Sequence, residues 1–487
     1  MNRYLAIIIA VMCGAELQAQ TLQEAPRLVV NITIDQLRTD YIDQFAPLYG
    51  SDGFRKLLQN GCVYDAASYP FMPIDRASAI ATISTGTSPY YHGIVGKYWL
   101  DRKTLRPVFC VDDPTHYVSP HHLQTSTIGD ELKISSNGSA IVWGIAATSE
   151  SAILSVGHAA NGVMYIDNNS GQWRSSTYYN ASFPEWLKAY STLHPVQSPA
   201  TSKKSKKSGR TLQYSLSYQN DAVVDASLSA MSNNAMGRDK ITDLMAVTLS
   251  AAPYHSTVTE NHQVEMESIY MSLDKTLARL ISGIQAYVGN DQVLFIVTST
   301  GYVDDTVDED LTQYRIPTGT FYINRTTNLL NMYLSAIYGQ GHYVETSFGR
   351  QLYFNHKLLE QKRISLTEML RRSQEFLVQN SGVGDVYTSE RLLNGNNDIT
   401  KLRNGFNPTV SGDILIDVTP GWNLLNEETK ETYNSRATFT PFPIIIYGND
   451  VKPGHINTPV TTDRIAPTIA KAIRIRAPNA CSAEPLF

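Results

Sequence analysis

Residues 27–38, which read RLVVNITIDQLR, constrain the fold more than any other stretch of the chain. The run from Leu28 to Ile34 is short and rich in β-branched and aliphatic residues, which favours a buried strand. Asp35 follows directly after its last apolar residue. Ligands of open α/β sheets bind at the carboxyl ends of the strands, so this position predicts that Asp35 lies in a site.

Strand and helix patterns alternate along most of the 487 residues. Strands are predicted at 28–34, 62–64, 140–146, 243–249, 292–298, 411–418 and 443–447, and helices at 78–84, 264–284 and 464–473. This alternation predicts an α/β domain with a central, mostly parallel sheet. Residues from about 97 to 240 interrupt the rhythm and are predicted as an inserted cap, with a hairpin at 162–173.

The first 19 residues have the three parts of a signal peptide. Arg3 supplies a positive start, residues 5–13 (LAIIIAVMC) form an apolar run, and residues 15–20 (AELQAQ) offer cleavage after Ala19. The apolar run is too short to cross a membrane. We therefore expect an exported protein, periplasmic or associated with the outer membrane, with a mature domain at 20–487 and no transmembrane segment.

Charge and cysteine content exclude several classes of protein. The net charge of −5 at pH 7 argues against a general nucleic-acid binder. The mature cysteines are Cys62, Cys110 and Cys481, without the spacing of a zinc framework or a redox motif. Export permits disulfides, and Cys62–Cys110 is the expected pair if one forms.

A series of short motifs follows in order along the chain. They are Ile34–Arg38 (IDQLR), Thr85–Pro89 (TGTSP), His92–Ile94 (HGI), Ser176–Tyr179 (STYY), Leu273–Lys275 (LDK), Ser411–Asp413 (SGD), Pro420–Trp422 (PGW) and Thr462–Thr468 (TDRIAPT). Through these motifs the chain resembles the alkaline phosphatase superfamily from about residue 27 to 485. The nearest branch is that of the bacterial phosphate-irrepressible alkaline phosphatases and the type I phosphodiesterases/nucleotide pyrophosphatases. The resemblance implies an alkaline-phosphatase-like three-layer sandwich with an inserted cap.

The resemblance also implies two zinc ions with six Asp and His ligands, and a Thr or Ser nucleophile. Carboxylates and imidazoles suit Zn²⁺, and paired metals stabilise both the attacking and the leaving oxygen. Asp35 matches the first ligand position. In register with the motifs, the nucleophile position holds Arg76, whose guanidinium remains protonated at neutral pH.

The other positions that the family reserves for this chemistry have changed in type. The five remaining ligand positions hold Pro253, Thr257, Ser299, Thr300 and Pro441. Three further positions, an Asn and a Lys-x-Arg pair in the family, hold Lys97, Thr148 and Glu150. We therefore expect no zinc cofactor, and we interpret these eight positions, together with Asp35 and Arg76, as a vestigial site.

A buried carboxylate without a metal requires a compensating charge, so Asp35 is expected to pair with Arg76 or Lys97. Ser78 and Thr82 are alternative nucleophiles, although neither has a His base nearby in the sequence, and helix-building roles are the simpler interpretation.

Three functions remain open at this point. The first is a catalytically inactive pseudoenzyme that serves as a binding or scaffold component of the cell envelope, with a protein partner there. The second is a hydrolase of phosphate monoesters, diesters or nucleotides with a non-standard site. The third is an anion-binding module in which Arg76 and Lys97 hold a phosphate or another anion.

Overall fold

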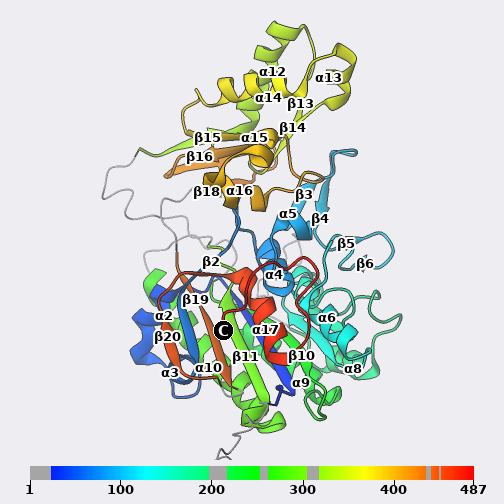
Figure 1. Ribbon diagram of the computed structural model, residues 1–487, viewed down its shortest axis with the longest axis vertical. Helices are drawn as coiled ribbons and strands as arrows, with labels where there is room; N and C mark the ends of the chain where they lie inside the picture. The colour runs from blue at the N-terminus through cyan, green and yellow to red at the C-terminus, as the bar shows by residue number, and fades with distance from the viewer. Residues whose placement is uncertain (1–23, 197–215, 253–261, 304–316, 435–439, 449–450) are drawn as a thin grey trace, which may run out of the picture.

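A ten-stranded sheet forms the lower body of the molecule, and a smaller lobe lies above it (Figure 1). The structure is a computed structural model that describes residues 24–196, 216–252, 262–303, 317–434, 440–448 and 451–487. The strands of the main sheet are β1 Leu28–Asp35, β2 Cys62–Ser68, β7 Val142–Ala146, β8 Gly162–Ile166, β9 Trp173–Arg174, β10 Asp243–Ser250, β11 Val293–Ser299, β19 Phe442–Gly448, β20 Gly454–Ile456 and β21 Val460–Thr461.

The order of the main sheet places β1 near its centre. The strands run β20-β2-β19-β11-β1-β10-β7-β8-β9, and β21 pairs with β2 beside β20. Both neighbours of β1 are parallel to it, with Asp35 beside Ser250 of β10 and Ile34 beside Ser299 of β11. The carboxyl ends of three adjacent strands therefore meet at one edge of the sheet, as the interpretation of residues 27–38 predicts.

Side chains alternate between the two faces of each strand, and helices cover both faces. Helices α2 Thr39–Phe45, α3 Phe54–Asn60, α9 Leu216–Asn233 and α10 His262–Val288 pack on one face, and α4 Arg76–Thr85, α6 Ile128–Ser135, α7 Ser149–Leu154 and α17 Ile465–Ile473 on the other. This arrangement confirms the three-layer α/β prediction. The helices predicted at 78–84, 264–284 and 464–473 correspond to α4, α10 and α17.

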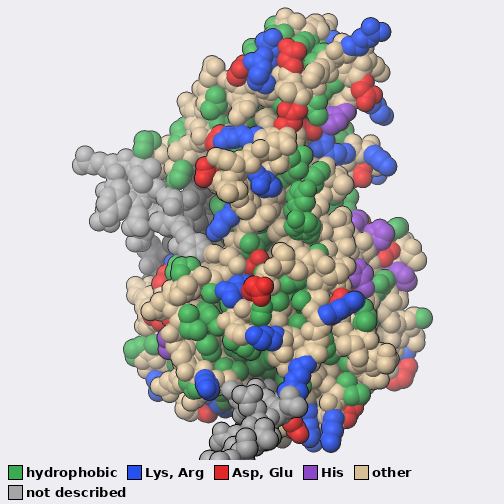
Figure 2. Space-filling model, in the orientation of Figure 1, with side chains coloured by type: hydrophobic (Ala, Val, Ile, Leu, Met, Phe, Trp, Pro, Cys, Tyr) green, Lys and Arg blue, Asp and Glu red, His purple; other side chains and the backbone are tan. Residues whose placement is uncertain are grey.

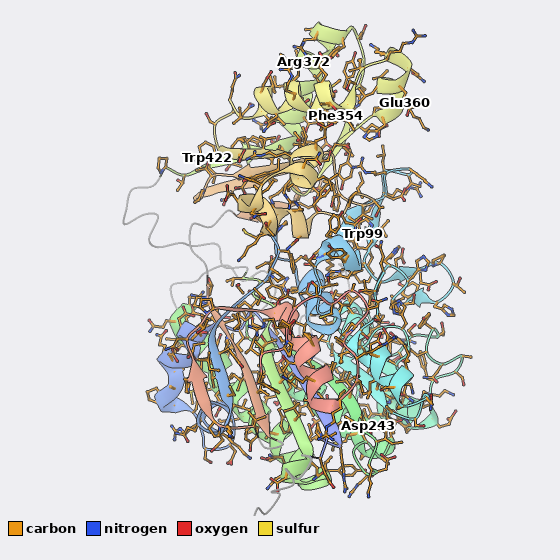
Figure 3. The ribbon with its side chains drawn as sticks, in the orientation of Figure 1. Trp99, Asp243, Phe354, Glu360, Arg372 and Trp422 are labelled. Carbon is orange, nitrogen blue, oxygen red and sulfur yellow. The ribbon has the colours of Figure 1, made fainter. Side chains whose placement is uncertain are left out.

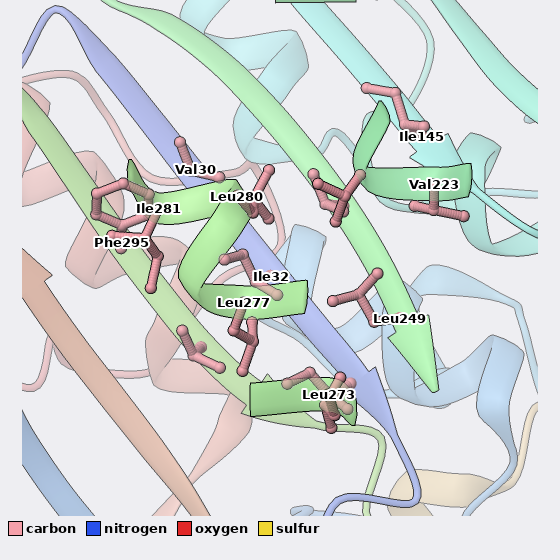
Figure 4. Packing of buried hydrophobic residues seen from close by; sticks show 14 of the residues in the cluster. Val30, Ile32, Ile145, Val223, Leu249, Leu273, Leu277, Leu280, Ile281 and Phe295 are labelled. Carbon is pink, nitrogen blue, oxygen red and sulfur yellow. The ribbon is translucent and has the colours of Figure 1, made fainter. Parts of the chain in front are cut away.

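The longest helix, α10, shows how the layers are held together. Its buried residues Leu273, Leu277, Leu280 and Ile281 recur at helical spacing and pack on Val30 and Ile32 of β1 and Phe295 of β11 (Figure 4). Full burial of an aliphatic side chain contributes about 1.5–3 kcal/mol to the free energy of unfolding. The helix thus covers the centre of the sheet on the face that lies away from α4.

The upper lobe has its own sheets and its own core (Figure 3). Its strands are β12 Gly319–Tyr322, β13 Val344–Phe348, β14 Gln351–Phe354, β15 Val383–Thr388, β16 Ile414–Val418, β17 Trp422–Leu425 and β18 Thr432–Asn434, covered by helices that include α12 Ile323–Tyr338 and α14 Leu366–Leu377. Between the lobes, Arg102 in the turn that connects β3 Tyr98–Leu100 and β4 Pro107–Phe109 reaches the buried Asp413, with 3.1 Å between Nη1 and Oδ2.

The cap predicted at 97–240 differs from this arrangement. Strands β7 and β8, which lie within that range, are parallel members of the main sheet. The inserted lobe instead spans 319–434, and it includes the strand predicted at 411–418. Strand and helix periodicity alternates in the lobe as it does in the body, so periodicity alone does not tell which sheet a strand joins.

Other local predictions have mixed outcomes. The hairpin at 162–173 is present, because β8 and β9 pair in antiparallel fashion. Cys62 and Cys110 do not form a disulfide; both are free thiols.

The proposed signal peptide at 1–19 lies outside the described residues. Every helix in the described ranges is too short or too polar to span a bilayer, and acidic and basic side chains are interspersed on the face shown in Figure 2.

Asp243 is the first residue of β10 and lies at the lower end of the body (Figure 3). Its carboxylate accepts hydrogen bonds from Ile141 N at 2.6 Å and Gly237 N at 2.8 Å. Burial nevertheless dominates and raises the pKa of Asp243 to about 6. The folded state therefore binds a proton that the unfolded state releases between about pH 4 and 6.

The sign of this pKa shift predicts the pH dependence of stability. The contribution of Asp243 is most favourable below about pH 4, and its loss lowers the free energy of unfolding by up to about 3 kcal/mol as the pH rises through 6. Asp243→Asn removes this titration, so the stability difference between variant and parent, measured by urea unfolding, should move in favour of the variant between pH 4 and 7. Parallel profiles for the two proteins would contradict this assignment.

Candidate functional site

The polar ends of three central strands form the floor of the candidate site. On the face that packs against α4, the first half of each strand is apolar and the second half is polar. The buried polar side chains are Asn31, Thr33 and Asp35 of β1, Thr248 and Ser250 of β10, and Thr298 and Thr300 at the end of β11. Burial of polar groups costs free energy unless they find partners, so their concentration here indicates a site rather than a packing layer.

Asp35 lies at the centre of this floor and is 4% exposed. Arg76 Nε donates to its Oδ2 at 2.6 Å, and Thr300 Oγ1 donates to its Oδ1 at 2.7 Å. The guanidinium of Arg76 also lies on the ring of Tyr302, with 4.2 Å from Cζ to the ring centroid. The prediction that Arg76 compensates the charge of Asp35 is confirmed.

The start of α4 explains why Arg76 points at Asp35. Asp75 is the N-cap: its backbone is extended, and its carboxylate accepts from Ala77 N at 2.8 Å. In return, Ser78 Oγ accepts from Asp75 N at 3.2 Å, which completes a capping box. The capping box fixes the first turn, of which Arg76 is the first residue. Ser78 is therefore part of the helix cap and not a displaced nucleophile.

Lys97 does not reach Asp35. Its Nζ lies 3.0 Å from Oε1 of Glu150, a buried residue of α7. Burial alone would lower the pKa of Lys97, but the ion pair with Glu150 raises it overall. Lys97 and Glu150 thus neutralise one another beside the site. The alternative prediction, in which Lys97 compensates the charge of Asp35, is wrong.

A small pocket opens between the strand ends and the helices α4, α7 and α9. Its free volume, including its mouth, is about 370 Å³. Of the positions singled out from the sequence, Asp35, Arg76, Thr148 and Thr300 line it together. The pocket thus brings together residues from four separate parts of the chain.

The remaining predicted positions lie elsewhere. Ser299 Oγ accepts from Gly301 N at 3.1 Å, and the carbonyl of Pro441 accepts from Thr39 N at 3.0 Å. Both residues thus serve the local backbone. Pro253 and Thr257 lie outside the described residues.

Thr82 has a histidine partner that its sequence neighbours do not reveal. Its Oγ1 lies 3.1 Å from Nε2 of His92, and both side chains are fully buried. Burial lowers the pKa of His92 to about 3, so its ring is neutral. Since neither side chain lines the pocket, the Thr82–His92 pair belongs to the core.

The described donor set does not fit a zinc pair. Both carboxylate oxygens of Asp35 are engaged, one by Arg76 and one by Thr300. Across the described ranges, His, Cys, Asp and Glu side chains nowhere gather in a group of three or more that could hold a metal ion. A guanidinium beside the one matching ligand repels a cation. The chemistry available at these residues is that of a guanidinium, a carboxylate and hydroxyl groups.

Several residues that line the pocket were not predicted from the sequence. Thr248 of β10, Ser151 of α7 and Gln219 of α9 all line the pocket. The polar alternation along β1, β10 and β11 is visible in the sequence and marks Thr248 as a residue on the Asp35 face. No comparable signal marks Gln219, because it is a partly exposed polar residue in the first turn of a helix, where polar residues are common.

Comparison with known proteins places the chain in a well-populated group. Residues 29–439 match the family described as type I phosphodiesterase / nucleotide pyrophosphatase. The alkaline phosphatase PafA of Elizabethkingia meningoseptica is 24% identical over 99% of this chain and 97% of its own length. A Myroides odoratus protein named calcium-transporting ATPase is 27% identical over 100% and 99%, and the alkaline phosphatase PhoV of Synechococcus elongatus 24% over 93% and 91%.

The crystal structure of PafA shows the same fold. It superposes with a TM-score of 0.81 at 24% identity and covers 95% of this chain and 98% of its own. The prediction of an alkaline-phosphatase-like fold is thereby confirmed.

The prediction of a catalytically inactive scaffold is contradicted by these comparisons. Relatives that match nearly the whole chain are named alkaline phosphatases, and the matched family is one of phosphodiesterases. The prediction rested on the replaced ligand, nucleophile and neighbouring positions. Loss of one set of catalytic groups does not exclude hydrolysis by another set, so the hydrolase alternative fits the comparisons better.

The Asp35–Arg76 pair predicts a large effect on stability when only one partner is removed. Arg76→Ala leaves a buried carboxylate whose remaining partner is Thr300, and we expect a loss of about 3 kcal/mol in the free energy of unfolding. The double change Asp35→Asn with Arg76→Met removes both charges and should recover most of this loss. Urea unfolding at pH 7 measures both.

The exposed pairs of Arg279 with Asp221 and Asp225 provide a matched control. Arg279→Ala is expected to cost less than about 1 kcal/mol, because solvent screens exposed ion pairs. Equal losses for Arg76→Ala and Arg279→Ala would show that the Asp35–Arg76 pair is not buried in the folded protein.

Proposed function

The chain belongs to the type I phosphodiesterase / nucleotide pyrophosphatase family, and from this membership and the geometry of the Asp35 pocket we propose that it hydrolyses phosphate esters without a zinc pair. The relatives named alkaline phosphatases support the choice of substrate class. The pocket lies at the carboxyl ends of parallel strands, where ligands of α/β sheets bind.

One observation carries the proposal, namely that a guanidinium and a carboxylate-bound hydroxyl line the same small pocket. The planar guanidinium of Arg76 matches the oxygens of a phosphoryl group. Thr300 Oγ1 donates to Asp35 at 2.7 Å, and a hydroxyl within hydrogen-bond reach of a base is the arrangement of an activated nucleophile.

The proposed reaction uses these three residues. Thr300 Oγ1 attacks the phosphorus, its proton passes to Asp35, and the bond from phosphorus to the ester oxygen breaks. Asp35 passes this proton to the leaving ester oxygen, which departs as the alcohol, and the Asp35 carboxylate is restored. Water then attacks the phosphorylated Thr300, phosphate departs and the hydroxyl is restored. Arg76 stabilises the negative charge on the phosphoryl oxygens throughout.

The proposed site of this reaction is outside the cytoplasm. The support is the three-part pattern of residues 1–19, which is typical of a cleaved signal peptide. Association with the outer membrane and a protein partner in the cell envelope remain predictions.

A second candidate function is the binding of a phosphate ester or another anion without turnover. The observation that favours it is the 2.6 Å ion pair of Arg76 with Asp35, since a neighbouring cation weakens a carboxylate as a base. In this alternative Arg76 is the anion-binding cation, and Lys97 is not, because Glu150 neutralises it.

Turnover of p-nitrophenyl phosphate and bis(p-nitrophenyl) phosphate, each with and without EDTA, tests the proposal. We expect activity that survives chelation and falls about 100-fold or more in Asp35→Asn and in Thr300→Val, because each removes part of the nucleophile and base pair. Arg76→Ala should raise KM and lower kcat.

Thr346→Val, in β13 of the upper lobe, is the matched control and should retain parental activity. Activity that EDTA abolishes, or that persists in Thr300→Val, would overturn the proposed mechanism. Binding of p-nitrophenyl phosphate without turnover would favour the second candidate.

A further inference from the structure

Part of the pocket lining is polar but uncharged. Thr148 and Ser151 come from the start of α7, Thr248 from β10, and Gln219 from the first turn of α9. Among the described residues that line the pocket, only Asp35 and Arg76 carry charge. A ligand that extends beyond the phosphoryl group therefore meets hydroxyl and amide groups.

The hydroxyl of Thr248 is one of the polar groups that the pocket offers to a ligand. Its side chain is 8% exposed, and within the described part of the chain its hydroxyl has no hydrogen-bond partner. By contrast, the hydroxyls of Ser250 and Thr298 donate to the carbonyls of Ala252 at 2.9 Å and Pro443 at 3.0 Å. The Thr248 hydroxyl thus lines the pocket with its donor and acceptor positions open to a ligand hydroxyl.

Ser151 provides a second hydroxyl beside it. Ser151 is 6% exposed, and its Oγ accepts from Thr148 Oγ1 at 2.9 Å. Its own proton is directed to no acceptor among the described residues. A hydroxyl that already accepts one bond is a good donor for another.

We propose that Thr248, Ser151 and Gln219 form a subsite for the alcohol part of the substrate, and that this alcohol is a small polyol such as glycerol. The inference rests on the proposed function. Neighbouring hydroxyls of a polyol both donate and accept, as the hydroxyl and amide groups of the subsite do. A charged alcohol would find no counter-charge there, and an apolar one would leave three polar groups desolvated.

The size of the pocket limits the polyol. Its free volume is about 370 Å³ with the open mouth included, so glycerol is among the smallest polyols that the subsite could take, whereas a disaccharide or a nucleoside would extend out of the pocket.

Glycerol phosphate and n-propyl phosphate isolate the contribution of the hydroxyls, because the two esters have similar size and differ in two hydroxyl groups. We expect kcat/KM, and affinity by calorimetry, to favour glycerol phosphate by about 10- to 100-fold. Thr248→Val is close to isosteric and should reduce this preference about tenfold. Gln219→Leu, at a partly exposed position, should reduce it as well. The remote Thr346→Val should preserve it.

The outcomes separate this inference from the proposed function. Equal binding of the two esters, or an unchanged preference in both Thr248→Val and Gln219→Leu, overturns the polyol subsite and leaves the phosphate site in place. Failure of both esters to bind overturns both proposals. Because calorimetry does not require turnover, the polyol preference is measurable even if the site only binds.

Discussion

The ion pair between Asp35 and Arg76 is the interaction on which the candidate site depends. Its carboxylate comes from the end of the central strand, and its guanidinium comes from the first residue of a helix on the α4 face. Two buried charges are stable only when they are paired and their remaining lone pairs are satisfied. Thr300 supplies that remaining bond. The ion pair and the Thr300 hydroxyl that binds it therefore define the chemistry of the pocket.

This pairing changes how the lost ligand positions are understood. In a metal site, several carboxylates and imidazoles share the charge of the ion. Here one cation from the chain stands beside one carboxylate, and the neighbouring Lys97 and Glu150 form a second neutral pair. The described charges around the pocket thus balance without a metal.

The sequence predicted the elements that depend on local pattern. The apolar run that ends in Asp35 predicted the central strand, and the loss of the metal partners of Asp35 predicted that it pairs with Arg76 or Lys97, of which Arg76 is the partner in the structure. Contacts between residues distant in the chain were harder to predict. Thr300 is separated from Asp35 by 265 positions, and Gln219 enters the pocket on a helix with no motif of its own. The cap was misplaced because periodicity reports strands but not the sheet that each strand joins.

The contact between Arg102 and Asp413 bears on how the two lobes are held together. Asp413 is 3% exposed, and it also accepts from Phe354 N at 2.8 Å and interacts with His356 Nε2 at 3.0 Å. A swing of the upper lobe away from the body would strip Arg102 from this buried carboxylate, which is costly. The Arg102–Asp413 ion pair therefore opposes separation of the two lobes.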